Sequence, residues 1–344
     1  MRVGKNPLKD QVAVRKRHFH RVILPAFIPQ DKGYFEHAAD VLEVCLRSLL
    51  ETTGEETAVT IVVNGASPKA RAVIGRFAGA ESRVDVIWKA CNVGKVEALF
   101  GAARMYHEPM ITMTDSDVLF RPGWLERVFE VFEAFPEAGV VSALPVPHLR
   151  RHYTSSTYLG SILRGLFRYG PNACREDMEM YLTDLQSPAL IPNDLLEAQP
   201  AVIRDGVVAL IGSTHMECTM RREVVEAAPR RECLTAMGGN SEWAWMDRPA
   251  DVKGWWKLSL PVAYVRHMGN SLSEDIISEL HEICANAKIR DQPELAAPDG
   301  RLPVEHILPG FIRDLGGRAV QWWFERRRKR QREERAATGV AEEP

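Results

Sequence analysis

The stretch ITMTDSDVLFRPGWLE, residues 111–126, joins an apolar, β-prone run to two closely spaced carboxylates and a Pro-Gly turn. Alternate side chains of a strand share a face, so Asp115 and Asp117 are predicted to project to the same side at the end of a buried strand. Neighbouring carboxylates repel each other unless a cation lies between them. Oxygen ligands of this kind suit Mg²⁺ or Mn²⁺, which commonly bridge to phosphate oxygens. A solvated Asp-Ser-Asp turn is the competing interpretation.

Strand-like and helix-like segments alternate on the N-terminal side of this stretch. Strands are predicted at 20–29 (stopping at Pro25), 57–67, 83–90 and 110–114, with helices at 35–53, 68–80 and 91–106. This alternation with short connections favours a parallel, doubly wound sheet, in which ligands bind beyond the carboxyl ends of the strands. Pro25, Asn64, Asn92 and Asp115 all fall at such ends, so these polar landmarks are expected at one edge.

The pattern is weaker on the C-terminal side. A helix at 122–135 and a strand at 140–145 are followed by residues 147–205, which show no clear periodicity. A stretch of this length without periodicity predicts an irregular insertion or lid that shapes an acceptor site. Regular elements resume at 207–228, and a terminal helix is predicted at 305–335.

The bulk composition indicates an ordinary globular protein. The chain has 344 residues, 45% of them hydrophobic, and a net charge of −2, which gives no overall bias toward nucleic acid. Its six cysteines are scattered without a Cys-x-x-Cys pair, which indicates reduced thiols in a cytosolic protein. No window approaches the roughly 18 uninterrupted apolar residues of a membrane span. A soluble protein, or one bound at most to a membrane surface, is therefore expected.

Both ends of the chain are basic, and the C-terminal end also carries aromatic residues. LPGFIRDLGGRAVQWWFERRRKRQREER (308–335) joins an apolar-aromatic stripe to a basic run. That combination suits an interfacial helix on anionic lipid. Packing of the stripe on the catalytic domain and an oligomer contact are the other two interpretations. Nucleic acid is not favoured as a partner, because no groove with interleaved aromatic residues is evident.

Six motifs follow one another in order along the first 271 residues: VILPAF (22–27), IVVNGAS (61–67), NVGKVEALFGAA (92–103), TDSD (114–117), SEWAWMDRPADVKGW (241–255) and VRHMGNS (265–271). In this order and spacing they resemble the family-2 glycosyltransferases of the nucleotide-diphospho-sugar transferase superfamily. The resemblance implies the glycosyltransferase-A fold, an α/β fold whose Rossmann-like, mostly parallel sheet is flanked by helices.

The same resemblance implies a division of the chain. A basic N-terminal segment at 1–19 would precede a catalytic domain at 20–271, and a C-terminal helical extension with a basic tail would occupy 272–344. Within the catalytic domain, residues 20–120 would form the nucleotide-binding half and residues 121–271 the acceptor half.

Seven residues would surround the nucleotide by resemblance: Pro25, Ala26, Phe27 and Asn64 beside the base and ribose, and Asn92, Gly94 and Lys95 in a loop under the phosphates. The family usually has aspartate where Asn64 stands. An amide both donates and accepts, so a base contact survives while the usual carboxylate–ribose contact is in question. Gly94 permits close backbone approach, and Lys95 could neutralise a phosphate. A simple turn at Asn64 and a helix cap beside a solvated Lys95 are the alternatives.

The resemblance also implies a metal site. Asp117 would bind the cation directly, and Asp115 would bind it through water or, with Ser116, hold the ribose. His267, at the end of a late strand, would supply a third ligand. Histidine mixed with carboxylate is compatible with Mn²⁺, which is favoured slightly over Mg²⁺.

On the acceptor side, Glu242 falls on the family's base position and Asp247 is the second candidate. The family's adjacent acid pair is replaced here by Ser241-Glu242. His215 and Trp243 would line the acceptor pocket. The alternative is that Glu242 and Asp247 merely form the polar face of a tryptophan-bearing helix.

Together these residues predict a cytoplasmic, metal-dependent glycosyltransferase, with membrane-surface contact and oligomer formation left open. The donor would be a nucleotide-diphosphate sugar, with UDP the first expectation, and the acceptor a glycan, a lipid-linked saccharide or a protein. Transfer would invert the anomeric centre in one displacement. The alternatives are a retaining transferase, a nucleotidyltransferase, and an inactive binding or scaffold protein of the same fold. A nucleotidyltransferase usually has a Gly-rich basic loop after the first strand, and the segment PAFIPQDKGYF does not have this character.

Overall fold

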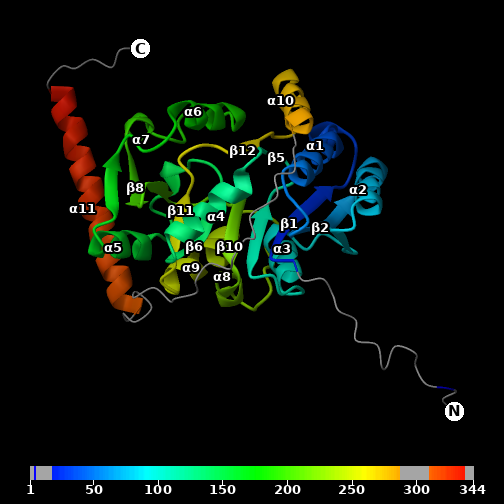
Figure 1. Cartoon of the computed structure of the whole chain (residues 1–344), viewed down its shortest axis with the longest axis horizontal. Coiled ribbons are helices and arrows are strands. Elements are labelled where there is room, and N and C mark those ends of the chain that lie inside the picture. The colour runs from blue at the N-terminus through cyan, green and yellow to red at the C-terminus, as the bar shows by residue number, and fades with distance from the viewer. Residues whose placement is uncertain (1–3, 5–17, 287–309, 338–344) are drawn as a thin grey trace.

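A ten-stranded sheet runs through the centre of the part of the chain that the structure describes (Figure 1). The computed structural model describes Gly4 and residues 18–286 and 310–337. The strand order is β3-β2-β1-β4-β10-β6-β11-β9-β8-β7, and a separate two-stranded sheet pairs β12 with β5. The predicted basic segment at 1–19 lies almost wholly outside the described residues.

The first half of the sheet is parallel and doubly wound, as predicted. Its strands are β1 (His20–Ile28), β2 (Thr57–Ala66), β3 (Val84–Trp88) and β4 (Met110–Thr114), connected by α1 (Ala38–Glu51), α2 (Pro68–Ala80) and α3 (Lys95–Ala103). Alternate residues of β1 supply two cores: Val22 and Leu24 pack with α1 and α2, while Ile23 packs with α3. The helices therefore cover opposite faces, and the carboxyl ends of the strands meet at one edge.

Strand β1 is longer than predicted. It was expected to stop at Pro25, yet its pairing with β2 continues through Pro25 to Ile28. Strand β4 pairs with β1 only as far as Ile23, so beyond that point β1 has one neighbour and the missing N–H of proline is tolerated. Strand β2 likewise passes through Asn64 and ends at Ala66, which excludes the simple turn at Asn64.

The second half of the sheet mixes strand directions. Strand β10 (Glu217–Arg221) is antiparallel to β4 and to β6 (Ala138–Ser142), and β11 (Trp256–Ser259) is parallel to β6. Strands β9 (Val207–Ile211), β8 (Gln199–Arg204) and β7 (Phe167–Gly170) complete the sheet in antiparallel succession. The predicted α/β class, with a mostly parallel central sheet flanked by helices, is confirmed, and its antiparallel pairs begin at β10.

Most of the remaining helices surround this half, whereas α10 and the first 3-10 turn pack on α1 (Figure 1). They are α4 (Trp124–Ala134), α5 (Ser155–Leu163), α6 (Arg175–Asp184), α7 (Asn193–Glu197), α8 (Arg222–Ala227), a π-helical turn (Trp243–Asp247), α9 (Arg248–Val252), α10 (Glu274–Asn286) and α11 (Gly310–Ala337), with 3-10 turns at Gly33–Phe35 and Pro147–Leu149. No helix in the described ranges is long and apolar enough to cross a membrane.

Residues 147–205 are not the irregular stretch that was predicted. They contain α5, β7, α6, α7 and β8, and the two strands extend the central sheet. The longest of these elements, α6, has only 10 residues. Elements this short do not repeat a period often enough to be recognised in sequence.

The C-terminal helix α11 lies along one edge of the molecule and packs on α5 (Figure 1). Phe324 is buried against the rings of Tyr158, Phe167 and Tyr169. At Gly317, a Cβ atom would lie 2.3 Å from the backbone oxygen of Ser155. The packing interpretation of this segment is therefore confirmed for one side of the helix.

Replacing Gly317 with alanine should lower the melting temperature, because the added methyl group meets backbone that has no room to move. Gly316→Ala is the matched control, since a Cβ there meets only the flexible Leu159 side chain, at 3.3 Å. Alanine gains about 0.5–1 kcal/mol over glycine inside a helix, so the control should be neutral or stabilising. Thermal unfolding of both variants tests this; equal melting temperatures would contradict close packing of α11 on α5.

Candidate functional site

The two aspartates lie where the central sheet meets the small one. Asp115 follows the last residue of β4, and its N–H donates to the carbonyl of Met216 at 2.8 Å. Asp117 precedes β5 (Val118–Phe120), and its carbonyl accepts from the N–H of Met268 at 2.8 Å. Backbone bonds to two later segments of the chain thus fix both acids at the carboxyl edge of the sheet, as predicted.

Asp117 is a partly buried acid, 32% exposed at its side chain, whose charge is not fully compensated. Burial, with a further contribution from Asp115, raises its pKa to about 6. Its Oδ2 lies 3.5 Å from Nε2 of His267, too far for a good hydrogen bond. Its Oδ1 and the Nδ1 of His267 are both buried without a hydrogen-bond partner among the described residues. The pair presents an oxygen and an imidazole donor set that a divalent cation would satisfy.

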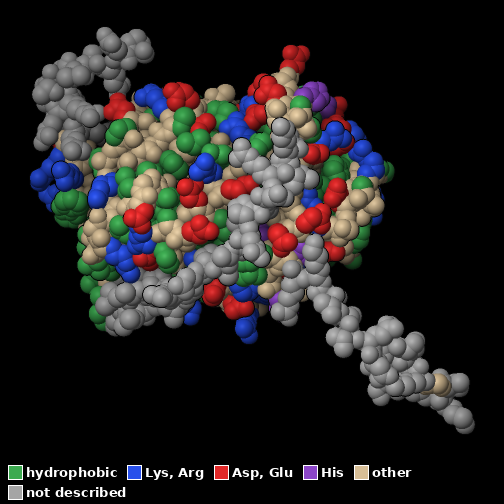
Figure 2. Space-filling model, viewed as in Figure 1, with side chains coloured by type: hydrophobic (Ala, Val, Ile, Leu, Met, Phe, Trp, Pro, Cys, Tyr) green, Lys and Arg blue, Asp and Glu red, His purple; other side chains and the backbone are tan. Residues whose placement is uncertain are grey.

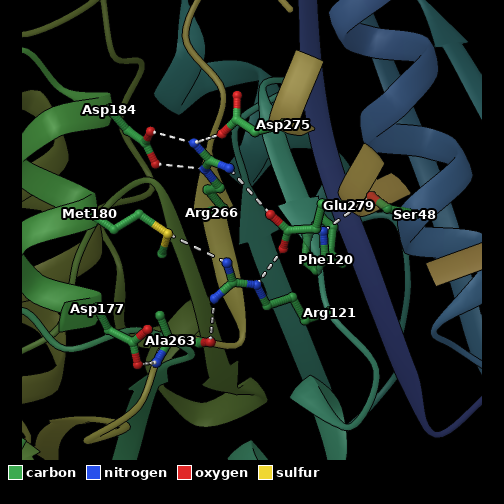
Figure 3. Close-up of polar contacts among 10 residues, drawn as sticks. All are labelled: Ser48, Phe120, Arg121, Asp177, Met180, Asp184, Ala263, Arg266, Asp275 and Glu279. Carbon is green, nitrogen blue, oxygen red and sulfur yellow. Dashed lines mark hydrogen bonds and ion pairs between the residues drawn. The ribbon is translucent and has the colours of Figure 1, made fainter. Parts of the chain in front are cut away.

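His267 is placed by β12 (Val265–His267), which pairs antiparallel with β5 so that His267 lies opposite Val118. Figure 3 shows the ion pairs by which two arginines connect this strand to the neighbouring helices. Arg266, the neighbour of His267, contacts Asp184 of α6 at 2.9 Å, and Asp275 and Glu279 of α10 at 2.7 and 3.3 Å. These carboxylates outweigh partial burial and raise the pKa of Arg266.

A second arginine extends the same network to β5. Arg121 contacts Glu279 at 2.6 Å and donates to the carbonyl of Ala263 at 2.9 Å (Figure 3). Asp177 of α6 accepts from the N–H of Ala263 at 2.8 Å, so α6 holds the segment that leads into β12. Helix α6, which is distant in the sequence, and α10, which soon follows β12, thereby fix the position of His267.

Lys95, the first residue of α3, occupies the space between the acids. Its Nζ lies 2.6 Å from Asp115 and 3.7 Å from Glu242, and it donates to the carbonyl of His215 at 3.2 Å. Burial opposes its charge, but Asp115 and Glu242 outweigh burial and raise its pKa. The solvated lysine of the alternative interpretation is excluded, because only 13% of this side chain is exposed.

The loop before Lys95 is held by two asparagines. The Asn64 amide donates to the carbonyl of Gly94 at 3.1 Å, and Asn92 Oδ1 accepts from the Gly94 N–H at 2.8 Å. Gly94 has φ +88°, and a Cβ there would lie 2.6 Å from the carbonyl oxygen of Thr235. Glycine is therefore required at position 94. The buried side chain of Asn64 holds this loop in place through its hydrogen bond to Gly94.

The end of β1 presents an aromatic side chain at the same edge. Ala26 is buried, whereas Phe27 is 41% exposed and packs edge-to-face on Phe35 at 5.8 Å. Gly65 allows this ring to lie flat on the neighbouring strand, because a Cβ there would come within 3.3 Å of it. Of the four residues predicted beside the base and ribose, Ala26 and Asn64 are buried and Pro25 is partly exposed, so Phe27 has the most accessible side chain.

The two acids predicted on the acceptor side have different surroundings. Glu242 is 17% exposed at its side chain and faces Lys95. Asp247 is buried and forms ion pairs with Lys257 and with Nε2 of His215. Burial opposes ionisation of Asp247, but Lys257 and His215 hold its pKa below the usual value. The structure thus gives Glu242 access to the site and uses Asp247 to orient His215.

Sequence reasoning missed three residues that contact members of the site or their neighbours in the chain. Lys257 is fully buried in β11 and donates to the carbonyl of His152 at 2.8 Å; the His152 ring lies 4.6 Å from that of Trp243. Tyr181 of α6 is hydrogen-bonded to Thr214, and burial raises its pKa to about 12. The lysine inside the apolar strand WKLS could have predicted a buried ion pair. No sequence pattern indicated that Tyr181 or His152 would lie at the site.

Within the described ranges, no group of three or more His, Cys, Asp and Glu side chains is arranged to hold a metal ion. Asp117 and His267 approach each other, while Asp115 is turned to Lys95. Two protein donors fit a cation that is completed by substrate phosphates, which is how Mg²⁺-type sites are usually built.

Replacing Lys257 with methionine should leave the buried Asp247 carboxylate without its ammonium partner. The free energy of unfolding should fall by about 3–5 kcal/mol. Adding Asp247→Asn removes that charge, so the double variant should lose less than the sum of the single variants. Lys253→Met, at an exposed position nearby, is the control and should change stability by no more than about 0.5 kcal/mol. Urea unfolding of the four variants measures the coupling; strictly additive losses would contradict the ion pair.

Comparison with known proteins bears on residues 34–174. This segment matches the family model described as glycosyl transferase family 2. The matched region includes β2, the Lys95 loop and the two aspartates, and it ends before Glu242 and His267. No curated protein sequence matches the chain.

Three solved structures are similar at low sequence identity. A mannosyltransferase, PcManGT from Pyrobaculum calidifontis in complex with GDP-Man and Mn²⁺, is 15% identical with a TM-score of 0.41, over 97% of this chain and 85% of that one. TarS of S. aureus is 10% identical with a TM-score of 0.42, over 79% of this chain and 40% of that one. Its fragment 1–349 in complex with UDP-GlcNAc is 11% identical with a TM-score of 0.39, over 79% and 68%. The identification depends on the family model: this chain is a glycosyltransferase that carries a glycosyl transferase family 2 region at residues 34–174.

Proposed function

We propose that this glycosyltransferase moves a sugar from a nucleotide-diphosphate sugar to an acceptor hydroxyl with inversion and with the help of a divalent metal ion. The observation that carries the proposal is the set of three contacts that joins four segments of the chain: Lys95 to Asp115, Lys95 to Glu242, and Asp117 to His267. In this proposal residues 20–120 bind the nucleotide and residues 121–271 bind the acceptor.

The donor would lie over the loop that Asn64 and Asn92 hold in place. Phe27 offers an exposed ring on which a base can stack. Asp117 and His267 would hold Mn²⁺ or Mg²⁺, and when bound this ion offsets the charge that develops on the diphosphate leaving group. Lys95 adds a fixed positive charge on the same side, and Asp115 orients it.

The acceptor would approach from the side of Glu242. A single displacement needs a base that removes the acceptor proton as the oxygen attacks the anomeric carbon. Glu242 is partly exposed and carries that role, while Asp247 is committed to Lys257 and His215. Asp247 therefore acts as a positioning residue for His215. Trp243, 36% exposed and packed on His152, offers an aromatic surface for a sugar ring.

Two alternatives give different results. A retaining enzyme of the same fold would not depend on Glu242 as a base. An inactive binding protein would bind nucleotide without turnover; the free, buried oxygen of Asp117 favours a working metal site over that reading. We expect the base of the donor to be uracil and the acceptor to be a glycan, a lipid-linked saccharide or a protein.

Glu242→Gln should leave donor binding unchanged and lower kcat for transfer by roughly 10²-fold or more, the usual scale for loss of a general base. Donor binding is measured by thermal shift, and the anomeric configuration of the product by NMR. A product of retained configuration, or an unchanged kcat, would remove Glu242 from this role.

Asp117→Asn should abolish metal-dependent stabilisation by nucleotide. A ligand that binds only the folded state raises the melting temperature, so UDP, GDP and their sugars are compared with and without Mn²⁺. The variant protein should melt no lower than the wild type in metal-free buffer, because the mutation removes a carboxylate charge that burial disfavours and that the 3.5 Å contact with His267 compensates only in part. Asp205→Asn, in an exposed turn, is the control. Equal metal-dependent shifts in the wild type and Asp117→Asn would contradict the metal site.

A further inference from the structure

The side of α11 that faces away from α5 exposes large apolar side chains. We refer to it as the α11 outer face; its apolar members are Phe311, Ile312, Leu315, Trp322 and Trp323, with exposures of 73%, 42%, 70%, 61% and 50%. Phe311, Leu315 and Trp322 recur at spacings that put them on one side of a helix. Apolar patches of this kind on a monomer usually mark an interaction site.

Cations follow the tryptophans on the same helix. The guanidinium of Arg326 lies 5.0 Å from the Trp322 ring, and that of Arg327 lies 5.5 Å from the Trp323 ring. Arg330 continues the row one turn later. Figure 2 shows Lys and Arg side chains gathered beside hydrophobic ones at the edge of the molecule where α11 lies.

Two of the acids of this region face the body of the protein, whereas Asp314 and Glu333 are exposed and pair with Arg318 and Lys329 along the helix at 2.9 and 3.8 Å. Glu325 contacts Arg150 at 2.8 Å, and Asp194 contacts Arg328 at 2.8 Å, both on the side that packs on the rest of the protein. Within the described part of the chain, no ion pair to Arg326, Arg327 or Arg330 is found. Arg326, Arg327 and Arg330 are therefore the exposed cations of the described part of the helix for which no ion pair is found, beside two exposed pairs at Asp314 and Glu333.

A groove of about 850 Å³ lies beside the outer face, between α11, α5 and β7. Its apolar lining includes Ile162, Phe167, Val320 and Trp323, and Arg168 and Arg327 also line it. Leu163, next to Ile162 at the end of α5, is 66% exposed. The apolar surface thus continues from α11 across the seam onto α5, with guanidinium groups beside it.

We propose that the α11 outer face and this groove bind the surface of an anionic lipid membrane. Trp322 and Trp323 would enter the interface, where amphipathic aromatic rings are most stable. Arg326, Arg327 and Arg330 would contact the acidic headgroups, whose negative charge complements theirs. A helix with this division of side chains lies in the plane of the interface.

Charge distinguishes a lipid surface from the other candidate partners. A second copy of the chain would bring a like row of cations into the same contact, and like charges repel. Nucleic acid would use the cations but would leave Phe311 and Leu315 in water. An anionic membrane satisfies both the apolar and the basic parts of the surface.

The test is flotation of the full chain with vesicles of phosphatidylcholine alone and with vesicles that also contain phosphatidylserine. The wild type should float with the anionic vesicles, less so as salt is raised, and stay unbound with the neutral ones. Trp322→Ala with Arg326→Glu should reduce the bound fraction at least 10-fold. Both side chains are exposed, so the melting temperature of this variant should not change.

The matched control is Trp88→Ala with Arg71→Glu. These residues form an equivalent exposed pair, 4.9 Å apart, on β3 and α2 at the opposite edge of the sheet, and the control should float like the wild type. Equal flotation of all three proteins, or none with anionic vesicles, would overturn the proposal. A wild-type dimer that Trp322→Ala with Arg326→Glu converts to monomers would assign the face to an oligomer contact instead. Flotation requires no turnover, so its outcome is independent of the proposed reaction.

Discussion

The ion pair between Lys95 and Asp115 is the interaction on which the site depends. Strand β4 ends in two acids that face the same edge of the sheet, and such a concentration of negative charge is unstable without a cation. Lys95, delivered by the start of α3, lies 2.6 Å from Asp115 and also reaches Glu242. One largely buried ammonium group thus connects the proposed donor side to the proposed acceptor side.

The two aspartates are used differently because their surroundings differ. Asp115 has its own cation, whereas Asp117 lies partly buried beside His267, with one buried oxygen that has no hydrogen-bond partner among the described residues. An acid of this kind, whose pKa is raised to about 6, is held by the fold at a cost in stability. The ion pairs of Arg266 around β12 offset this loss of stability and keep His267 beside Asp117 (Figure 3).

A short segment joins the proposed membrane face to the acceptor side. Arg150 and Thr154 contact Glu325 and Gln321 of α11, and between them the carbonyl of His152 accepts from Lys257. The His152 ring packs on that of Trp243. An enzyme that lies on a membrane through α11 would therefore hold its acceptor side close to that surface, which suits a lipid-linked acceptor under the proposed function.

The sequence by itself determined the parallel half of the sheet and the identity of the paired aspartates, because long apolar runs and strand-end motifs are local patterns. It could not assign the elements within 147–205, each too short to repeat a period, nor separate the roles of Glu242 and Asp247. Those depended on Lys257 and His215, which reach Asp247 only after β10 and β11 join the sheet. Likewise Phe324 and Trp323 are neighbours in one aromatic run, and only packing on α5 buries the first and exposes the second. Contacts between distant segments decide burial and charge pairing, and no local pattern encodes them.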